Sequence, residues 1–109
     1  MNIIEQNQKQ IEMLCEKHKV KSLFAFGSVL TDRFNDESDL DFLVTFENID
    51  LNDYADNYFE LVDSLEKLLG REVDLISEKT LTNPYLIKSI NRNRLKVYER
   101  RSPGLAAWC

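Results

Sequence analysis

Three aspartates and a glycine–serine pair are the residues of this sequence whose types and spacing could carry out chemistry. Asp39 and Asp41 stand two residues apart in the run Ser38-Asp39-Leu40-Asp41-Phe42-Leu43-Val44. On a strand, residues two apart share one face, with Cα atoms roughly 6.6 Å apart. Carboxylates so placed suit hard cations such as Mg²⁺, and they can bridge the roughly 3.5–4 Å between the ions of a two-metal phosphoryl-transfer site. The spacing therefore predicts a metal site at Asp39 and Asp41.

A third carboxylate, Asp74, stands in the apolar run Val73-Asp74-Leu75-Ile76, where an acid is unexpected. If this run forms a strand beside that of Asp39 and Asp41, Asp74 completes a cluster of three acids, and a metal gives such a cluster a physical reason. The alternative is an edge strand on which Asp74 faces water. A strand with two aspartates followed by a strand with one favours the cluster.

Gly27 and Ser28 close the apolar run 21–26. Glycine at the end of a strand lets the backbone approach a ligand closely, and Ser28 can open a short helix. Backbone N–H groups at a helix start bind nucleotide phosphates. Because a glycine–serine pair after a strand is usually only a turn, the pair acquires this meaning through the aspartates that follow it.

The surrounding pattern predicts the elements that position these residues. Leu40, Phe42 and Val44 should share one face of a strand, with Asp39, Asp41 and Leu43 on the other. Gly70 is a helix stop, and Asn83 before Pro84 is a helix start. The predicted order is a helix over 3–18, strands over 21–26 and 39–46, a helix over 53–69, a strand over 72–77, a helix over 83–91 and a strand over 95–99. This order indicates one α/β or α+β domain, a sheet with helices packed on it.

Composition restricts the classes of function. The chain has 109 residues and a net charge of −5, which argues against nucleic acid as a partner. No apolar run is long enough to span a membrane, and two distant cysteines favour a reduced, cytoplasmic setting. His18 is expected to be a solvated helix residue. Basic residues gather late in the chain, either as a solvated face, which we favour, or as a surface for phosphates or an acidic partner: Lys88, Arg92, Arg94, Lys96, Arg100 and Arg101.

The last residues differ in composition from the rest. We predict one domain over residues 1–101 and a disordered tail or expression scar over 102–109. The alternative for this tail is a docking peptide led by Trp108.

The motif as a whole resembles a known family. Gly27-Ser28, ten intervening residues and Asp39-x-Asp41 resemble the signature of the nucleotidyltransferase superfamily related to DNA polymerase β, and the short chain looks like a minimal nucleotidyltransferase (MNT). The resemblance implies a single domain with a mixed four-stranded sheet flanked by helices. It also implies that Gly27 and Ser28 hold the triphosphate, that Asp39 and Asp41 ligate two Mg²⁺ ions, and that Asp74 ligates the catalytic ion and helps to activate the acceptor hydroxyl.

Family members often carry an Ala-Arg-Gly triplet shortly after the Gly-Ser pair, where this chain has Leu30-Thr31-Asp32. Arg33 is therefore the expected basic contact to the triphosphate. The resemblance implies transfer of AMP from ATP to a hydroxyl, on a tyrosine of a small all-helical HEPN-type toxin that this antitoxin would neutralise. The alternatives are a non-catalytic antitoxin that acts by occlusion, and an antibiotic- or tRNA-modifying enzyme. A homo-oligomer stays open.

Overall fold

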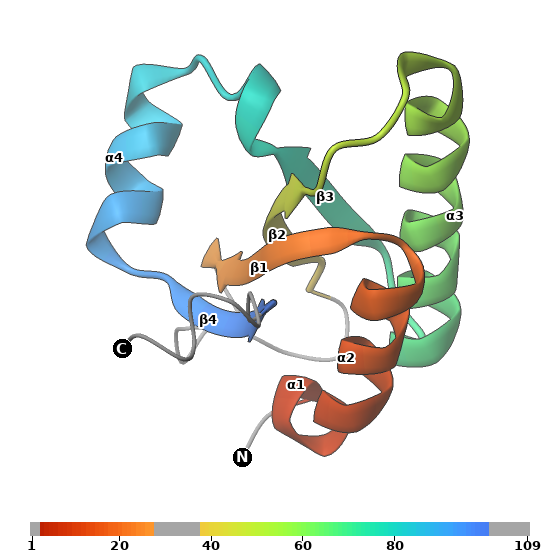
Figure 1. The fold of residues 1–109 in the computed structure, drawn as a ribbon. Helices are drawn as coiled ribbons and strands as arrows, with labels where there is room; N and C mark the ends of the chain where they lie inside the picture. Colours follow the sequence, from red (N-terminus) through yellow and green to blue (C-terminus); the bar gives the residue numbers. More distant parts are fainter. Residues whose placement is uncertain (1–2, 28–37, 101–109) are drawn as a thin grey trace, which may run out of the picture.

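Alternating hydrophobic residues build a four-stranded sheet that helices cover on both faces (Figure 1). The computed structural model describes residues 3–27 and 38–100. Its elements are α1 (Ile3–Gln6), α2 (Gln8–Lys17), β1 (Val20–Phe26), β2 (Leu40–Phe46), α3 (Leu51–Leu69), β3 (Val73–Ser77), the 3₁₀ turn η2 (Glu78–Thr80), α4 (Pro84–Arg92) and β4 (Leu95–Glu99).

The sheet has the strand order β3-β2-β1-β4. β1 pairs antiparallel with both β2 and β4, whereas β2 and β3 are parallel and are joined through α3. A parallel pair needs such a crossover, because its two strands run in the same direction. The predicted mixed four-stranded sheet flanked by helices is confirmed.

The two faces of the sheet have separate cores. On one face, Leu40, Phe42 and Val44 pack against α1, α2 and the buried stripe of α3. On the other face, Leu43 packs with Phe26 of β1 and Ile90 of α4. The predicted alternation along β2 is therefore correct. It sends Asp41 to the same face as Leu43, the face that α4 covers.

The N-terminal helix differs from its prediction. In place of one helix over 3–18, α1 and α2 are separated at Asn7, whose side-chain Nδ2 donates to the carbonyl of Ile3 over 2.9 Å. Asparagine competes in this way with the helical hydrogen bonds of the backbone. Ile4 and Ile11 are still both buried, so the interruption preserves the apolar face.

The predicted ends of the later helices are confirmed. Gly70 follows α3 in the left-handed region at φ +67°, the conformation that glycine adopts without strain. The Asn83 side chain accepts hydrogen bonds from the backbone N–H groups of Tyr85 and Leu86, with Pro84 in the first turn. α3 begins at Leu51, two residues earlier than predicted.

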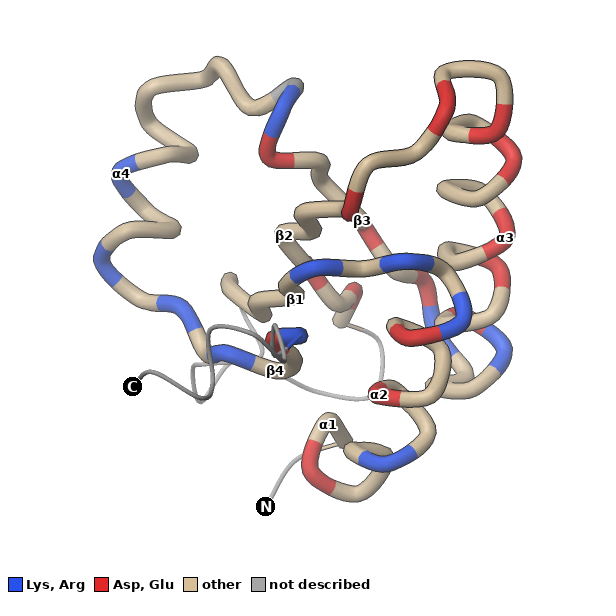
Figure 2. Tube along the Cα trace, viewed as in Figure 1, with Lys and Arg blue, Asp and Glu red and all other residues tan. Residues whose placement is uncertain are grey.

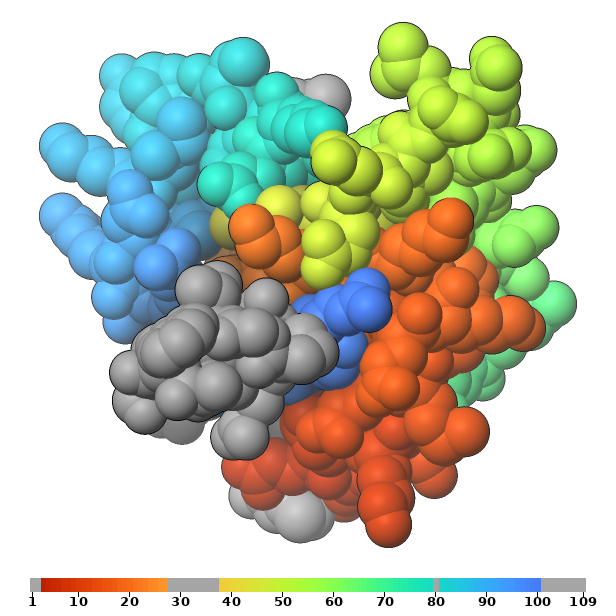
Figure 3. Space-filling model, viewed as in Figure 1, coloured from red at the N-terminus to blue at the C-terminus, as the bar shows by residue number. Residues whose placement is uncertain are grey.

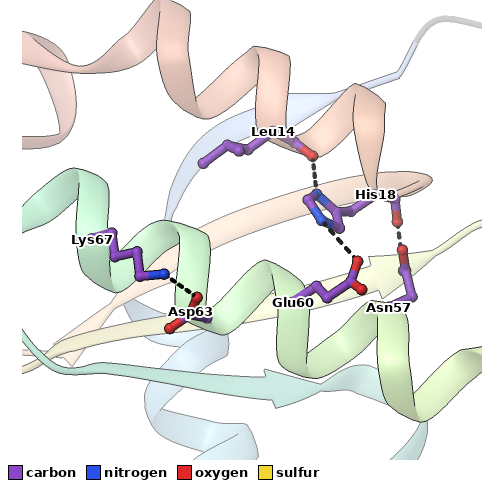
Figure 4. A network of polar contacts seen from close by, with 6 residues as sticks. All are labelled: Leu14, His18, Asn57, Glu60, Asp63 and Lys67. Atoms are coloured by element: carbon purple, nitrogen blue, oxygen red, sulfur yellow. Dashed lines mark hydrogen bonds and ion pairs between the residues drawn. The ribbon is translucent and has the colours of Figure 1, made fainter.

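His18 is buried, and its prediction as a solvated residue is wrong. Its ring Nδ1 donates to the carbonyl of Leu14, and its Nε2 lies 3.9 Å from the carboxylate of Glu60 on α3 (Figure 4). Asn57 of α3 donates to the carbonyl of His18 over 2.7 Å. The lysines beside His18 suggested solvent, but the histidine fastens the end of α2 to α3.

Two expectations concern the ends of the chain and the membrane. Within residues 3–27 and 38–100, no helix combines the length and the apolar character needed to cross a bilayer. The tail 102–109 and the domain boundary at residue 101 lie outside the described residues.

Candidate active site

Asp41 and Asp74 stand side by side on neighbouring strands. In the parallel pair of β2 and β3, the Cα partner of Asp41 is Asp74. Partner residues of adjacent strands lie roughly 4.8 Å apart and point to the same face. Asp39 comes immediately before β2 and is exposed. The strands thus bring all three predicted aspartates to one end of the β2–β3 pair.

The electrostatics of Asp41 reflect this arrangement. Partial burial raises the pKa of the Asp41 carboxyl above its ordinary 3.8, and the negative charges of Asp74 and Asp39 raise it further. Like charges at close range disfavour each other's ionised form, and a cation placed between them reverses the effect. The side-chain oxygens of three aspartates are the donors that Mg²⁺ prefers. The residues present therefore fit a divalent cation.

Gly27 leaves the space that the Asp41 carboxylate occupies. Its φ is +81°, and a Cβ added there would lie 2.5 Å from Asp41 Oδ2. Real Cβ atoms essentially never approach another atom so closely. Phe26, the residue before it, is the Cα partner of Asp41 in the β1–β2 pair. Glycine is thus required here both by the backbone conformation and by the approach of the carboxylate.

The end of the sheet that carries the aspartates is fastened by contacts that the sequence did not reveal. Arg71 Nη1 donates to the carbonyl of Ser38 over 3.0 Å, and the Leu40 N–H donates to the carbonyl of Glu72 over 3.1 Å. Both bonds join the start of β2 and the segment just before it to the two residues before β3. Arg71 therefore positions Asp39 and Asp74 relative to each other, although Ser38 and Arg71 are too far apart in the chain for any local motif to pair them.

The outer edge of β3 is held by side chains of α3. The Tyr58 hydroxyl donates to the carbonyl of Leu75, and the Glu66 carboxylate accepts from the Val73 N–H over 3.1 Å. These side chains bond to backbone groups of β3 that would otherwise be free to hydrogen-bond to a further strand. They fix the strand that carries Asp74 from the side opposite β2.

The sequence-predicted site residues therefore divide into two sets. Gly27, Asp39, Asp41 and Asp74 are brought together. Ser28 and Arg33 lie outside the described residues, so their contact with a triphosphate stays a prediction. In the part of the chain that is described, no three His, Cys, Asp or Glu side chains are gathered tightly enough to enclose a metal ion as they stand. The three aspartates are neighbours in the fold, and a metal site formed by them stays a prediction.

Comparison with known proteins identifies the family. Residues 8–97 match the model of the nucleotidyltransferase domain. The chain belongs to the nucleotidyltransferase family. The match spans β1, β2 and β3, and it includes Gly27 and the three aspartates.

Named relatives agree with this nucleotidyltransferase assignment. The chain is 40% identical over 90 residues to the "putative protein adenylyltransferase MJ1379" of Methanocaldococcus jannaschii, covering 83% of this chain and 89% of that protein. A solved structure described as a "putative minimal nucleotidyltransferase" is 31% identical with a TM-score of 0.70, covering 87% of this chain and 95% of that one. The fold is thus that of a minimal nucleotidyltransferase.

A more distant neighbour shares the fold at 20% identity. It belongs to a structure of a tri-AMPylated Shewanella oneidensis HEPN toxin in complex with an MNT antitoxin. Its TM-score is 0.62, and the match covers 89% of this chain and 73% of that one.

Proposed function

We propose that this nucleotidyltransferase moves AMP from ATP to a protein hydroxyl, a tyrosine of a HEPN-type partner, with Mg²⁺ as cofactor. The observation that carries the proposal is the pairing of Asp41 with Asp74 across β2 and β3, with Asp39 beside them and Gly27 opening the space. A partner of this kind is supported by the fold neighbour that was solved with a tri-AMPylated HEPN toxin. The free, buried thiol of Cys15 fits a reduced cytoplasmic setting.

Each aspartate has its own role in the proposed reaction. Asp39 and Asp41 hold the ions, and the exposed Asp74 stands where an arriving hydroxyl can reach it. Bound Mg²⁺ would offset the charge of the triphosphate and lower the pKa of the acceptor hydroxyl. Gly27 and Ser28 receive the terminal phosphates, with Arg33 as the basic contact. The acceptor hydroxyl gives its proton to the Asp74 carboxylate and its oxygen forms a bond to the α-phosphorus. The bond from the α-phosphorus to the oxygen that bridges the β-phosphorus breaks, and pyrophosphate leaves.

The test is transfer of labelled AMP to a copurified HEPN-type partner. The double variant Asp39→Asn/Asp41→Asn keeps the shape of both side chains and removes their charge, so labelling should fall by at least about 100-fold while the fold is retained. Asp50→Asn is the matched control, because Asp50 is exposed at the start of α3 and makes no side-chain cap hydrogen bond. Equal labelling by wild type and the double variant would refute the proposal.

The alternative is neutralisation of the partner by occlusion. It is favoured by the open arrangement of the carboxylates, which as they stand do not enclose an ion among the residues described. Rescue of growth in cells that express the toxin separates the two functions. Full rescue by the double variant would favour occlusion, whereas retained binding with lost rescue would favour chemistry.

A further inference from the structure

An apolar groove runs along the outer side of β3, beneath the first half of α3. It consists of two adjoining hollows of about 400 and 300 Å³ that share Tyr54 and Ser77. Tyr58, Phe59 and Ile76 line the larger hollow, and the smaller one continues to Glu78 and Lys79. Figure 3 shows the molecule notched between the start of α3 and the segment after β3, where the groove opens. Phe59 is 67% exposed, a large apolar side chain left at the rim.

Acidic residues border this groove. α3 exposes Asp56 and Asp63 on the side of the helix that carries Phe59, and Figure 2 shows acidic residues following α3 while basic residues follow α4 toward β4. On the helix surface, Asp56 and Asp63 lie three and four residues from Phe59, so they flank it. Asp63 also pairs with Lys67 over 2.9 Å, an exposed pair that leaves the acidic character of the rim in place. The apolar groove thus has a negatively charged border.

Backbone pairing does not explain this surface. The edge of β3 already has the Tyr58 hydroxyl on the Leu75 carbonyl and the Glu66 carboxylate on the Val73 N–H. An extended segment could not pair with the strand at these positions without displacing both side chains. What remains open to a partner is the apolar floor and the acidic rim, which recognise side chains.

The groove begins directly beside the candidate active site. Its floor includes Leu75 and Ile76, the residues that follow Asp74 on β3. The hydroxyl of Tyr58, which lines the groove, donates to the carbonyl of Leu75, the residue directly after Asp74. A segment lying in the groove would therefore end next to a carboxylate of the site.

We propose that this groove docks the acceptor protein, through a segment that places an apolar side chain beside Phe59 and Lys or Arg residues against Asp56 and Asp63. This inference rests on the proposed transfer to a protein acceptor. It adds a surface that holds the substrate, and it assigns that substrate a basic, amphipathic docking segment.

The test is a titration of the whole ¹⁵N-labelled chain with two short peptides, in the absence of ATP and Mg²⁺. Binding is monitored by the amide chemical shifts of the protein. The peptides share the same leucines and one tyrosine and differ only in flanking arginines or glutamates. The arginine peptide should shift the amides of Tyr54–Phe59 and Leu75–Ser77 and bind about tenfold more tightly at low salt, with the difference shrinking as salt rises. Because no nucleotide is present, the result is independent of whether transfer occurs.

Two variants remove the two recognition elements. Phe59→Ser should weaken binding about fivefold or more, and Asp56→Lys/Asp63→Lys should abolish the preference for the arginine peptide. Met13→Ser is the matched control, since Met13 on α2 is 68% exposed and lies away from the groove.

Three results would overturn the docking surface. One is equal affinity for the two peptides, or none. Another is a set of shifts confined to α4 and β4. The last is concentration-dependent shifts of the groove without peptide, which would assign the surface to a second copy of the chain. Loss of AMP transfer in Phe59→Ser with unchanged Mg²⁺ affinity would support docking, whereas the Asp39/Asp41 variant alone decides the chemistry.

Discussion

Replacing Gly27 with alanine separates the backbone role of this glycine from its role in making room for a carboxylate. Gly27 and Gly70 both have positive φ, +81° and +67°. At either position, an alanine side chain in the left-handed region costs about 1–2 kcal/mol. Nothing lies within 4 Å of a Cβ built on Gly70, so Gly70→Ala measures the backbone cost alone.

The difference between the two variants falls on Asp41. The Cβ of Gly27→Ala must separate from Asp41 Oδ2 by about 0.9 Å, the difference between 2.5 Å and the 3.4 Å at which ordinary contact begins. A carboxylate is the far end of a flexible side chain and can rotate away, which adds little to the loss of stability. However, a displacement of about 1 Å at a catalytic group costs about 100-fold in rate.

Both variants should therefore lose similar stability, about 4–8 °C in Tm for each kcal/mol in a domain of this size. Only Gly27→Ala should lose Mg²⁺ binding and AMP transfer. Mg²⁺ binding is measured from the amide chemical shifts during a Mg²⁺ titration. Equal Mg²⁺ affinity and transfer rate in Gly27→Ala and Gly70→Ala would contradict this role of Gly27, whether both variants keep them or both lose them.

Three further predictions concern other contacts. Burial raises the pKa of the Cys15 thiol from 9.0 to about 12, so between these pH values the unfolded chain ionises first and wild type should lose about 1.4 kcal/mol of stability per pH unit. Urea unfolding of Cys15→Val at pH 8 and pH 10 should show a smaller loss, and an equal loss would contradict this cause. Asn83→Ala removes the cap of α4 and should cost about 1 kcal/mol, measured as a lower Tm; an unchanged Tm would mean that the cap contributes nothing. Arg71→Met removes the hydrogen bond to the Ser38 carbonyl, so it should lower the free energy of unfolding by about 1.5 kcal/mol and weaken Mg²⁺ binding. Loss of stability with full Mg²⁺ affinity would show that Arg71 does not position the aspartates.

The parts of this protein that local spacing determines could be predicted from its sequence. Residues two apart on a strand share a face, which was enough to place Asp41 with Leu43 and opposite Phe42. Gly70 and Asn83 act through their own backbone and side chain, so the ends of α3 and α4 were predictable within two residues. An acid within the apolar run after a strand with two aspartates predicted Asp74 as the third acid before any pairing of strands was visible.

Features that depend on distant partners could not be predicted in this way. His18 has lysines on both sides in the sequence, but its carbonyl and ring face Asn57 and Glu60 of α3, about 40 residues later. The bond from Arg71 to Ser38 and the groove beside Phe59 likewise arise only when α3 crosses between two parallel strands. Asp74 combines both predictions made for it, because it is exposed on an edge strand and is also the partner of Asp41.

That edge position bears on how the site opens and closes. β3 has a neighbouring strand on one side only, and on the other it is held by the side chains of Tyr58 and Glu66. Elements with few partners open locally at lower free energy than the core. Fraying of this one strand would withdraw Asp74 while Asp41 stayed on β2 inside the sheet and Asp39 stayed immediately before it. Amide hydrogen exchange at Leu75 would then report how often the site loses its third carboxylate. α3 sets this frequency through the side chains of Tyr58 and Glu66, which lie about two helical turns apart.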